Sequence, residues 1–180
     1  MRTTDVSNSI DIMFSAGQIA ERLDALAKEI AALKIPGLLV VPILKGSFVF
    51  AADLIRALHR AGLNPEVDFL TLSSYKKSRV SSGQVTILRD LDLEVEGRSV
   101  LIIDDVLDSG RTLAFAKDLI SARGARQILT CVLLDKKVTR AVNIKADFSA
   151  FECPDTFVVG YGMDVAHRYR ELPFVGRLPG

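Results

Sequence analysis

The sequence predicts an α/β fold with a central, mainly parallel, twisted sheet flanked by helices. Apolar runs typical of strands alternate along the chain with segments of helical periodicity. Two of these runs, 99–105 and 128–134, have apolar residues on both faces, as is typical of parallel strands covered by helices on both sides. The chain has 180 residues, of which 49% are hydrophobic, enough for one sizeable core. We therefore expect a single domain over residues 1–180.

The first half of the chain predicts two helices and a strand. Residues 15–34 predict a helix because apolar residues recur there at spacings of three and four, with Ser15 as a suitable N-cap. These residues are Ile19, Leu23, Leu26, Ile30 and Leu33. The apolar run 38–44 predicts a buried strand, and residues 47–61 predict a second helix.

The remaining elements follow the same alternation. Residues 66–75 alternate like a strand, and 85–88 predict the return arm of a hairpin. A helix is predicted over 111–123, between the two buried strands. Short strands are expected at 147–151 and 156–161. The longest loop, 75–84, is rich in Ser, Lys and Gly, so it is either a disordered tip or a mobile lid.

Charge and composition exclude several classes of function. The chain has 23 Lys and Arg residues against 22 Asp and Glu, so no overall positive field attracts nucleic acid or a membrane surface. Cys131 and Cys153 form neither a disulfide framework nor a metal-binding spacing. No apolar run approaches the roughly 18 residues of a membrane span, and residues 1–14 lack a signal-peptide pattern. We expect a cytoplasmic protein with no nucleic-acid or membrane partner.

The stretch VLIIDDVLDSGRTL, residues 100–113, carries the strongest functional signal. Ligands of open parallel sheets bind beyond the carboxyl ends of the strands, so Asp104 and Asp105 face a crevice. A turn then leads into a helix whose first backbone N–H groups bind an anion. The residues of this predicted phosphate cradle are Asp108, Ser109, Gly110, Arg111 and Thr112. Carboxylates beside a phosphate suit a sugar diol or a divalent cation, so we predict a phosphorylated sugar as ligand.

An ordinary helix N-cap is the competing interpretation of this stretch. Asp and Ser are common at helix starts in any protein, and a lone Asp-Ser-Gly would favour that interpretation. The two further acids directly behind a buried strand favour a functional site. The sequence contains neither a GxxxxGK[ST] loop nor a complete GxGxxG motif.

The stretch resembles the signature of type I phosphoribosyltransferases, which bind phosphoribosyl pyrophosphate (PRPP). The similarity extends from about residue 10 to residue 178 and is greatest to the hypoxanthine and hypoxanthine-guanine branch. Its other segments are ILKGSFVFAADL at 43–54, SSY at 73–75, and ADFSAFECPDTFVVGYGMD at 146–164 followed by YRELP. The last segment is specific to the purine branch.

The resemblance implies an enzyme that transfers ribosyl 5-phosphate from PRPP to a 6-oxopurine and releases pyrophosphate with Mg²⁺. It also implies a small hood built from the N-terminal and C-terminal segments. By match to the family, Asp104 and Asp105 hold the ribose hydroxyls, and residues 108–112 wrap the 5-phosphate. Asp108 would also lie beside the purine N7 as general base or proton partner.

The purine site is likewise implied by the resemblance. Lys136 matches the lysine that donates to the purine O6, although Lys137 next to it leaves the register open by one. Phe157 matches the aromatic residue that stacks on the base, and Val158 the residue whose backbone reads its edge. Asp164 lies at this site and matches the acid that binds Mg²⁺. Considered singly, Lys136 would be interpreted as an ordinary lysine at a strand end, and Asp164 as a surface charge. Phe157 and Val158 would be interpreted as core residues of a strand.

Further matches concern pyrophosphate. Lys45 and Gly46 match a loop in which the peptide bond before the lysine is cis, and Arg170 matches a cation on the pyrophosphate side. Ser74 and Tyr75 head a segment, 73–84, that closes over the site in the family. The metal ligands implied for Mg²⁺ are Asp104, Asp105 and Asp164.

Two departures and three alternatives stay open at this point. Asp104 stands where many relatives have Glu, and Arg111 where Lys or Asn is common. The alternatives are an RNA-binding relative of the uracil type, an enzyme for xanthine or adenine, and a noncatalytic PRPP sensor. Residues 146–164 argue against the first and, with Lys136, against the second. The preference among guanine, hypoxanthine and xanthine stays undetermined. We expect a homodimer or homotetramer, because relatives form such assemblies.

Overall fold

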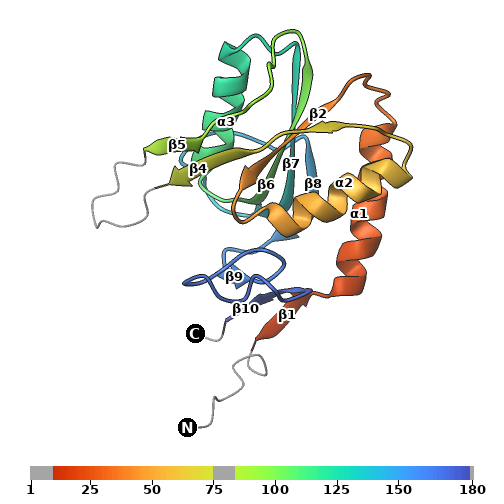
Figure 1. The fold of residues 1–180 in the computed structure, drawn as a ribbon. Coiled ribbons are helices and arrows are strands. Elements are labelled where there is room, and N and C mark those ends of the chain that lie inside the picture. The colour runs from red at the N-terminus through yellow and green to blue at the C-terminus, as the bar shows by residue number, and fades with distance from the viewer. Residues whose placement is uncertain (1–9, 75–83, 179–180) are drawn as a thin grey trace.

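The computed structural model describes residues 10–74 and 84–178. The strands in this part of the chain are β1 (Asp11–Phe14), β2 (Leu39–Leu44), β3 (Glu66–Val67), β4 (Leu70–Ser74), β5 (Val85–Arg89), β6 (Ser99–Leu107), β7 (Gln127–Lys136), β8 (Phe148–Cys153), β9 (Val158–Val159) and β10 (Val175–Arg177). The helices are α1 (Ala16–Ala31), α2 (Phe48–Arg60) and α3 (Arg111–Ala122). The predicted α/β class is confirmed (Figure 1).

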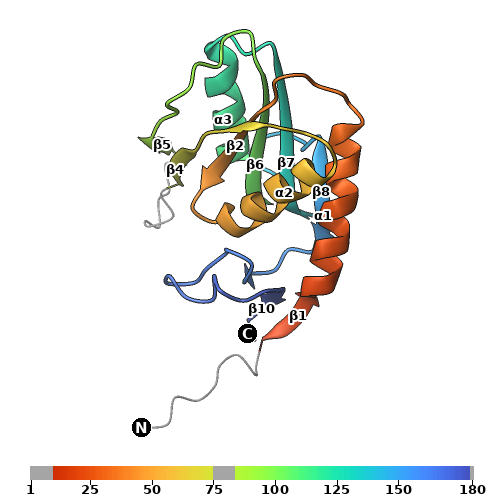
Figure 2. The same ribbon diagram turned by 45° about the vertical axis from the view of Figure 1, so that its right-hand side comes forward.

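The larger sheet has the strand order β5-β4-β2-β6-β7-β8, and β3 also pairs with β2. Its pairs are parallel except for β4 with β5, which are antiparallel as predicted for a hairpin. Helices α1 and α2 cover one face of this sheet and α3 covers the other (Figures 1 and 2). Successive residues of the central strands therefore face different cores: Leu101 packs with the α1 and α2 side, and Ile102 with the α3 side. Both cores need apolar residues, which explains the nearly continuous apolar runs.

A second, smaller sheet joins the two ends of the described chain. Strand β10 lies at its centre and pairs antiparallel with both β1 and β9. Figure 1 shows this sheet beyond the carboxyl ends of β2, β6 and β7. In the part of the chain that the structure describes, no helix is both long and apolar enough to cross a bilayer.

The N-terminal helix follows its local sequence closely. The Ser15 Oγ accepts a hydrogen bond from the Gln18 backbone N–H at 3.3 Å, and the Gln18 side chain accepts one from the Ser15 N–H at 2.8 Å. This reciprocal capping box confirms Ser15 as the N-cap. The helix ends at Ala31, three residues before the predicted end.

Two predicted strands are wrong in extent. The segment 66–75 is broken at Asp68, whose buried carboxylate accepts hydrogen bonds from the N–H groups of Asp92 at 2.7 Å and Leu93 at 2.8 Å. These partners are distant in sequence, so local alternation could not reveal the break. The predicted strand 156–161 is reduced to Val158–Val159, because Gly160 and Tyr161 have positive φ values of 94° and 52°, which end the extended backbone.

Candidate active site

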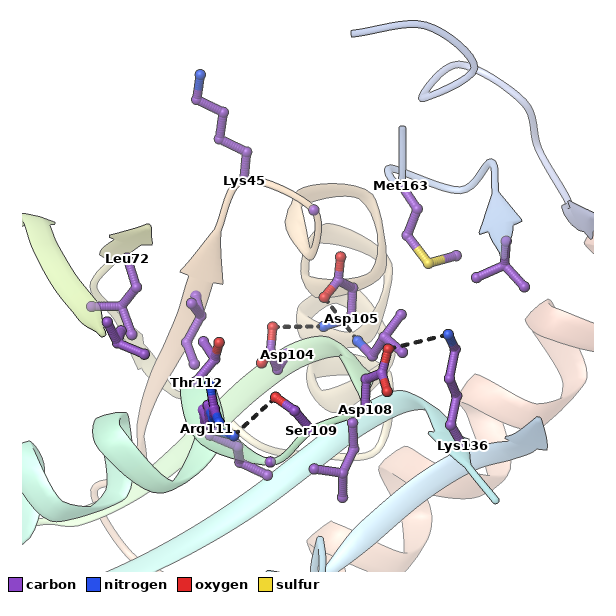
Figure 3. A pocket seen from close by; sticks show the side chains of 18 of the residues that line it. Lys45, Leu72, Asp104, Asp105, Asp108, Ser109, Arg111, Thr112, Lys136 and Met163 are labelled. Carbon is purple, nitrogen blue, oxygen red and sulfur yellow. Dashed lines mark hydrogen bonds and ion pairs between the residues drawn. The ribbon is translucent and has the colours of Figure 1, made fainter. Parts of the chain in front are cut away.

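A cavity of about 620 Å³ opens where β2, β6 and β7 end. One side is formed by the ends of these parallel strands and the start of α3, and the other by the segment around β9 (Figure 3). The sequence-predicted residues that line it are Lys45, Gly46, Asp104, Asp105, Asp108, Ser109, Gly110, Arg111, Thr112, Lys136, Phe157, Val158 and Asp164. Segments separated by more than a hundred residues thus meet in one place.

The turn between β6 and α3 has the geometry of an anion cradle. Gly110 occupies the N-cap position with φ of 81°, and a Cβ there would lie 2.7 Å from the Ile144 Cγ2, so both conformation and space require glycine. The competing N-cap interpretation predicts Asp or Ser at this position, where the structure has a residue without a capping side chain. The Ser109 Oγ accepts only a long hydrogen bond, 3.4 Å, from the Arg111 N–H. The first backbone N–H groups of α3 are therefore suited to a phosphate.

The two acids at the end of β6 differ in their surroundings. Asp104 is only 6% exposed, and its Oδ1 accepts a hydrogen bond from the Asp105 backbone N–H at 3.0 Å. Burial raises the pKa of the Asp104 carboxyl well above its usual range, and the adjacent Asp105 charge raises this pKa further. The Asp105 carboxylate in turn accepts from the Val106 N–H at 2.8 Å. A buried acid next to a partly exposed one suits a diol or a cation that compensates the charge.

The opposite end of the cavity joins a lysine to an acid. The Lys136 Nζ donates to the Asp108 Oδ2 at 3.2 Å, and Figure 3 shows the two side chains pointing toward each other. Lys136 is only 8% exposed. The neighbouring Lys137 instead pairs with the exposed Glu152 at 2.6 Å. The structure therefore removes the ambiguity of one residue in the sequence: Lys136 is the lysine that reaches the cavity.

The segment around β9 contributes an aromatic side chain and an acid. Phe157 is 57% exposed and lines the cavity, while Val158 is buried beside it. The Asp164 carboxylate pairs with the Arg170 guanidinium at 2.9 Å and accepts from the His167 backbone N–H at 2.8 Å. Arg170 also donates to the Gly162 carbonyl at 2.6 Å and lines a different groove. Arg170 thus pairs with Asp164 but does not line the cavity, where the resemblance implied a contact with pyrophosphate.

The loop after β2 agrees with its predicted conformation. The Leu44–Lys45 peptide bond is cis, as the resemblance implied. The Lys45 side chain is exposed and points away from the acid pair (Figure 3). Ser74 is the last residue of β4, and Tyr75 with the following predicted lid residues up to 83 lies outside the described residues.

The predicted metal site can be compared with these positions. Within residues 10–74 and 84–178, no group of three or more His, Cys, Asp or Glu side chains is arranged to hold a metal ion. Asp104, Asp105 and Asp164 therefore line one cavity without forming a three-carboxylate site. The Asp104–Asp105 pair still fits Mg²⁺, which is usually held by one or two carboxylates together with substrate oxygens and water.

Some lining residues carry no recognisable sequence signal. Met163 is 4% exposed and lines the cavity, as do Leu72 and Leu107. Their apolar side chains look like ordinary core residues in the sequence. Only the position of Met163 next to Asp164 in a matched segment could have indicated its place.

Comparison with known proteins agrees with this geometry. The sequence profile of the phosphoribosyl transferase domain matches residues 10–166. The chain belongs to the phosphoribosyltransferase family. The resemblance stated from the sequence is thereby confirmed, and the signature residues 100–113 lie within the matched range.

Relatives of this phosphoribosyltransferase are similar over most of its length. It is 51% identical to the hypoxanthine-guanine phosphoribosyltransferase of Bacillus subtilis over 140 residues, which cover 78% of this chain and 76% of that protein. It is 39% identical to the hypoxanthine phosphoribosyltransferase of Escherichia coli over 176 residues, 96% and 97% of the two chains. The crystal structure of a Staphylococcus aureus hypoxanthine phosphoribosyltransferase superposes with a TM-score of 0.90 at 32% identity, covering 99% of this chain and 97% of that one.

Proposed function

We propose that this phosphoribosyltransferase is a purine salvage enzyme that transfers ribosyl 5-phosphate from PRPP to hypoxanthine. The products are inosine monophosphate (IMP) and pyrophosphate, and guanine is a second substrate that gives GMP. The observation that carries the proposal is the contact between the Lys136 Nζ and the Asp108 Oδ2 at 3.2 Å, beside a phosphate cradle.

This contact places a donor and an acceptor side by side, as a 6-oxopurine requires. The O6 and N7 atoms are neighbours on one edge of such a base. An ammonium can only donate, so Lys136 suits the O6 acceptor and disfavours the 6-amino group of adenine. A carboxylate accepts, so Asp108 suits a protonated N7. The exposed ring of Phe157 would stack on the base, and the backbone of Val158 would contact its edge.

The reaction then follows from these positions. The base N9 attacks the ribose C1, the bond from C1 to the pyrophosphate oxygen breaks, and its electron pair leaves with pyrophosphate. The proton on N7 passes to the Asp108 carboxylate. Backbone N–H groups of residues 109–112 hold the 5-phosphate, while Asp104 and Asp105 accept hydrogen bonds from the ribose hydroxyls. Positioning and electrostatics supply most of the rate, because the protein makes no covalent bond.

Mg²⁺ is the proposed cofactor. The ion would be held by oxygens of PRPP together with Asp104 and Asp105, and it would neutralise the charge that develops on pyrophosphate. Asp164 is less suited than Asp104 and Asp105 to bind Mg²⁺ directly, because its carboxylate already pairs with the Arg170 guanidinium at 2.9 Å. Lys45 and Gly46 would lie on the pyrophosphate side of the cavity.

Several finer expectations belong to the same proposal. The small sheet β1-β10-β9 would act as the hood over the base, and residues 73–84, including Ser74 and Tyr75, as the lid. The enzyme would work in the cytoplasm as a homodimer or homotetramer. The uracil-type, adenine-specific and noncatalytic alternatives receive less support, because the relatives with 39–51% identity carry hypoxanthine or hypoxanthine-guanine in their names.

The experiment is a panel of free bases incubated with PRPP and Mg²⁺, with nucleotide formation followed by chromatography. We expect turnover of hypoxanthine and guanine, with little or none of adenine and uracil. Xanthine also carries a 6-oxo group, so its turnover measures a preference that the sequence left open. Turnover of adenine or uracil without turnover of 6-oxopurines would contradict the proposal. Binding of PRPP without turnover of any base would favour the sensor alternative.

A further inference from the structure

We propose that Arg140 is a positioning residue that holds Lys136 in place for base recognition and ties it to the phosphate turn. This inference rests on the proposed function, because it assigns a role within the same site. Arg140 does not line the cavity, so it would act only through Lys136 and through the loop 137–147 between β7 and β8.

The Arg140 side chain is held by acceptors at the end of β7 and within the loop that follows. Its Nη2 donates to the Lys136 carbonyl oxygen at 3.0 Å and also pairs with the Asp135 carboxylate. Its Nη1 donates to the Ile144 carbonyl oxygen at 3.3 Å. The side chain is only 16% exposed. A planar guanidinium can hold several acceptors at fixed angles, which a lysine ammonium cannot reproduce.

The other end of this loop touches the phosphate turn. The Val142 backbone N–H donates to the Ser109 carbonyl oxygen at 3.1 Å. The Ile144 side chain fills the space that a Cβ on Gly110 would need, 2.7 Å from that position. Residues 142–144 therefore pack on the turn that cradles phosphate, and Arg140 connects them to the lysine.

These contacts form a closed ring. Lys136 contacts Asp108 at 3.2 Å, and Ser109, the next residue, contacts Val142. Arg140 links the loop that carries Val142 back to Lys136. The proposed base end and phosphate end of the cavity are thus linked through one partly buried guanidinium.

Lys136 needs a positioning residue because the lysine side chain is flexible. Its side chain is a flexible four-carbon stem, so the place of the ammonium depends on how firmly the backbone is held. Lys136 is the last residue of β7, and the sheet holds the chain only one residue further, where the Lys137 N–H donates to the Cys153 carbonyl oxygen at 2.8 Å. A substitution far from the reacting atoms that misplaces a substrate-binding group by about 1 Å can reduce the rate by about 100-fold.

The test is a double-mutant cycle with Arg140→Met and Lys136→Met. We expect Arg140→Met to raise the KM for hypoxanthine and the Kd of IMP by about tenfold or more. In the Lys136→Met background, the same substitution should change the Kd of IMP much less than tenfold, because the lysine it positions is gone and only its support of the phosphate turn remains. Equal effects in both backgrounds would overturn the inference, since a merely structural role is additive.

Two controls keep the outcome interpretable. Lys145→Met removes an exposed positive charge from the same loop, and we expect KM and Kd within about twofold of the wild-type values. If Arg140→Met does not fold, judged by circular dichroism and thermal unfolding, Arg140→Lys replaces it with the same expected dependence on Lys136. Absence of hypoxanthine turnover in the wild-type enzyme would overturn both proposals, whereas additive effects with normal wild-type turnover would overturn only this one.

Discussion

The Asp105 carboxylate occupies the space that a side chain on Gly46 would need: its Oδ2 lies 1.8 Å from the position of a Cβ on residue 46. The loop after β2 and the acid at the end of β6 are therefore in direct contact across the cavity. Only glycine leaves room for this carboxylate, so the choice of residue at position 46 determines where an acid 59 positions later can lie.

We predict that Gly46→Ala displaces the Asp105 carboxylate and lowers kcat/KM for PRPP by about tenfold or more, because misoriented contacts weaken transition-state stabilisation. Steady-state kinetics with varied PRPP would measure this. The matched control is Gly17→Ala in α1, where the nearest atom to the new Cβ is the Ser15 Oγ at 4.0 Å. That variant should keep normal kinetics, and an equal loss in both would contradict the argument.

Asp108→Asn should reduce kcat by about 100-fold to 10,000-fold, the usual contribution of a general base. The KM for PRPP should change much less, because Asn keeps the size of the side chain and the backbone cradle remains. Single-turnover kinetics at saturating PRPP would isolate the chemical step. Unchanged turnover would show that the carboxylate has no role in proton transfer.

Substitution of Lys136 should relax discrimination at position 6 of the base. We expect Lys136→Met to lower kcat/KM for hypoxanthine by at least about tenfold, while activity with bases that lack the 6-oxo group falls less. Lys137→Met is the matched control, since Lys137 pairs with Glu152 on the surface at 2.6 Å. A retained preference for oxo over amino bases in Lys136→Met would assign recognition to the backbone instead.

Gly110→Ala should destabilise the protein and impair PRPP binding together. The residue has φ of 81°, and a left-handed conformation costs alanine about 1–2 kcal/mol. The new Cβ would also meet the Val142 carbonyl oxygen at 2.9 Å, which adds to the loss. Chemical denaturation would give the change in the free energy of unfolding, and calorimetry the affinity for PRPP. Normal stability with normal affinity would contradict the predicted cradle.

The raised pKa of Asp104 predicts a pH-dependent stability. Burial is the larger cause of this shift, and the adjacent Asp105 charge is the next. Between its usual pKa and the raised value, folded Asp104 keeps a proton that the unfolded chain has lost. This group therefore lowers the stability of the ligand-free protein as pH rises through that window.

Asp104→Asn removes this titration and serves as the test. We expect the Tm of the variant to exceed that of the wild-type protein by a margin that grows as pH rises above about 4, the usual pKa of an Asp carboxyl. Catalytic activity should fall, because an amide binds ribose hydroxyls and Mg²⁺ less well than a carboxylate. A difference in Tm that is the same at every pH would show that Asp104 titrates normally.

The sequence predicted those parts of the fold that local patterns determine. Helix α1 has its capping residues and its buried stripe within one segment, and the β6–α3 turn has its glycine and acids in one run. The signature could therefore be interpreted from adjacent residues. Lys136 needed more, because two adjacent lysines are equivalent until strand β7 directs one inward and the other to Glu152.

The remaining features depend on contacts between distant segments. The break at Asp68 is stabilised by N–H groups of Asp92 and Leu93, 24 and 25 residues away. The pairing of Arg170 with Asp164 and the contacts of Arg140 likewise follow from how loops meet in three dimensions. An arginine in a polar loop has no local signature, so no sequence pattern separates Arg140 from a solvated surface charge.

The central position of β10 in the small sheet has a consequence for biosynthesis. Residues 175–177 supply the shared partner of β1 and β9, so neither outer strand can pair until these residues have emerged from the ribosome. The parallel core can assemble earlier, whereas the wall bearing Phe157 and Val158 must be added last. A nascent chain that stops short of residue 175 would therefore leave the proposed nucleobase pocket unfinished, even with the proposed sugar-phosphate portion already folded.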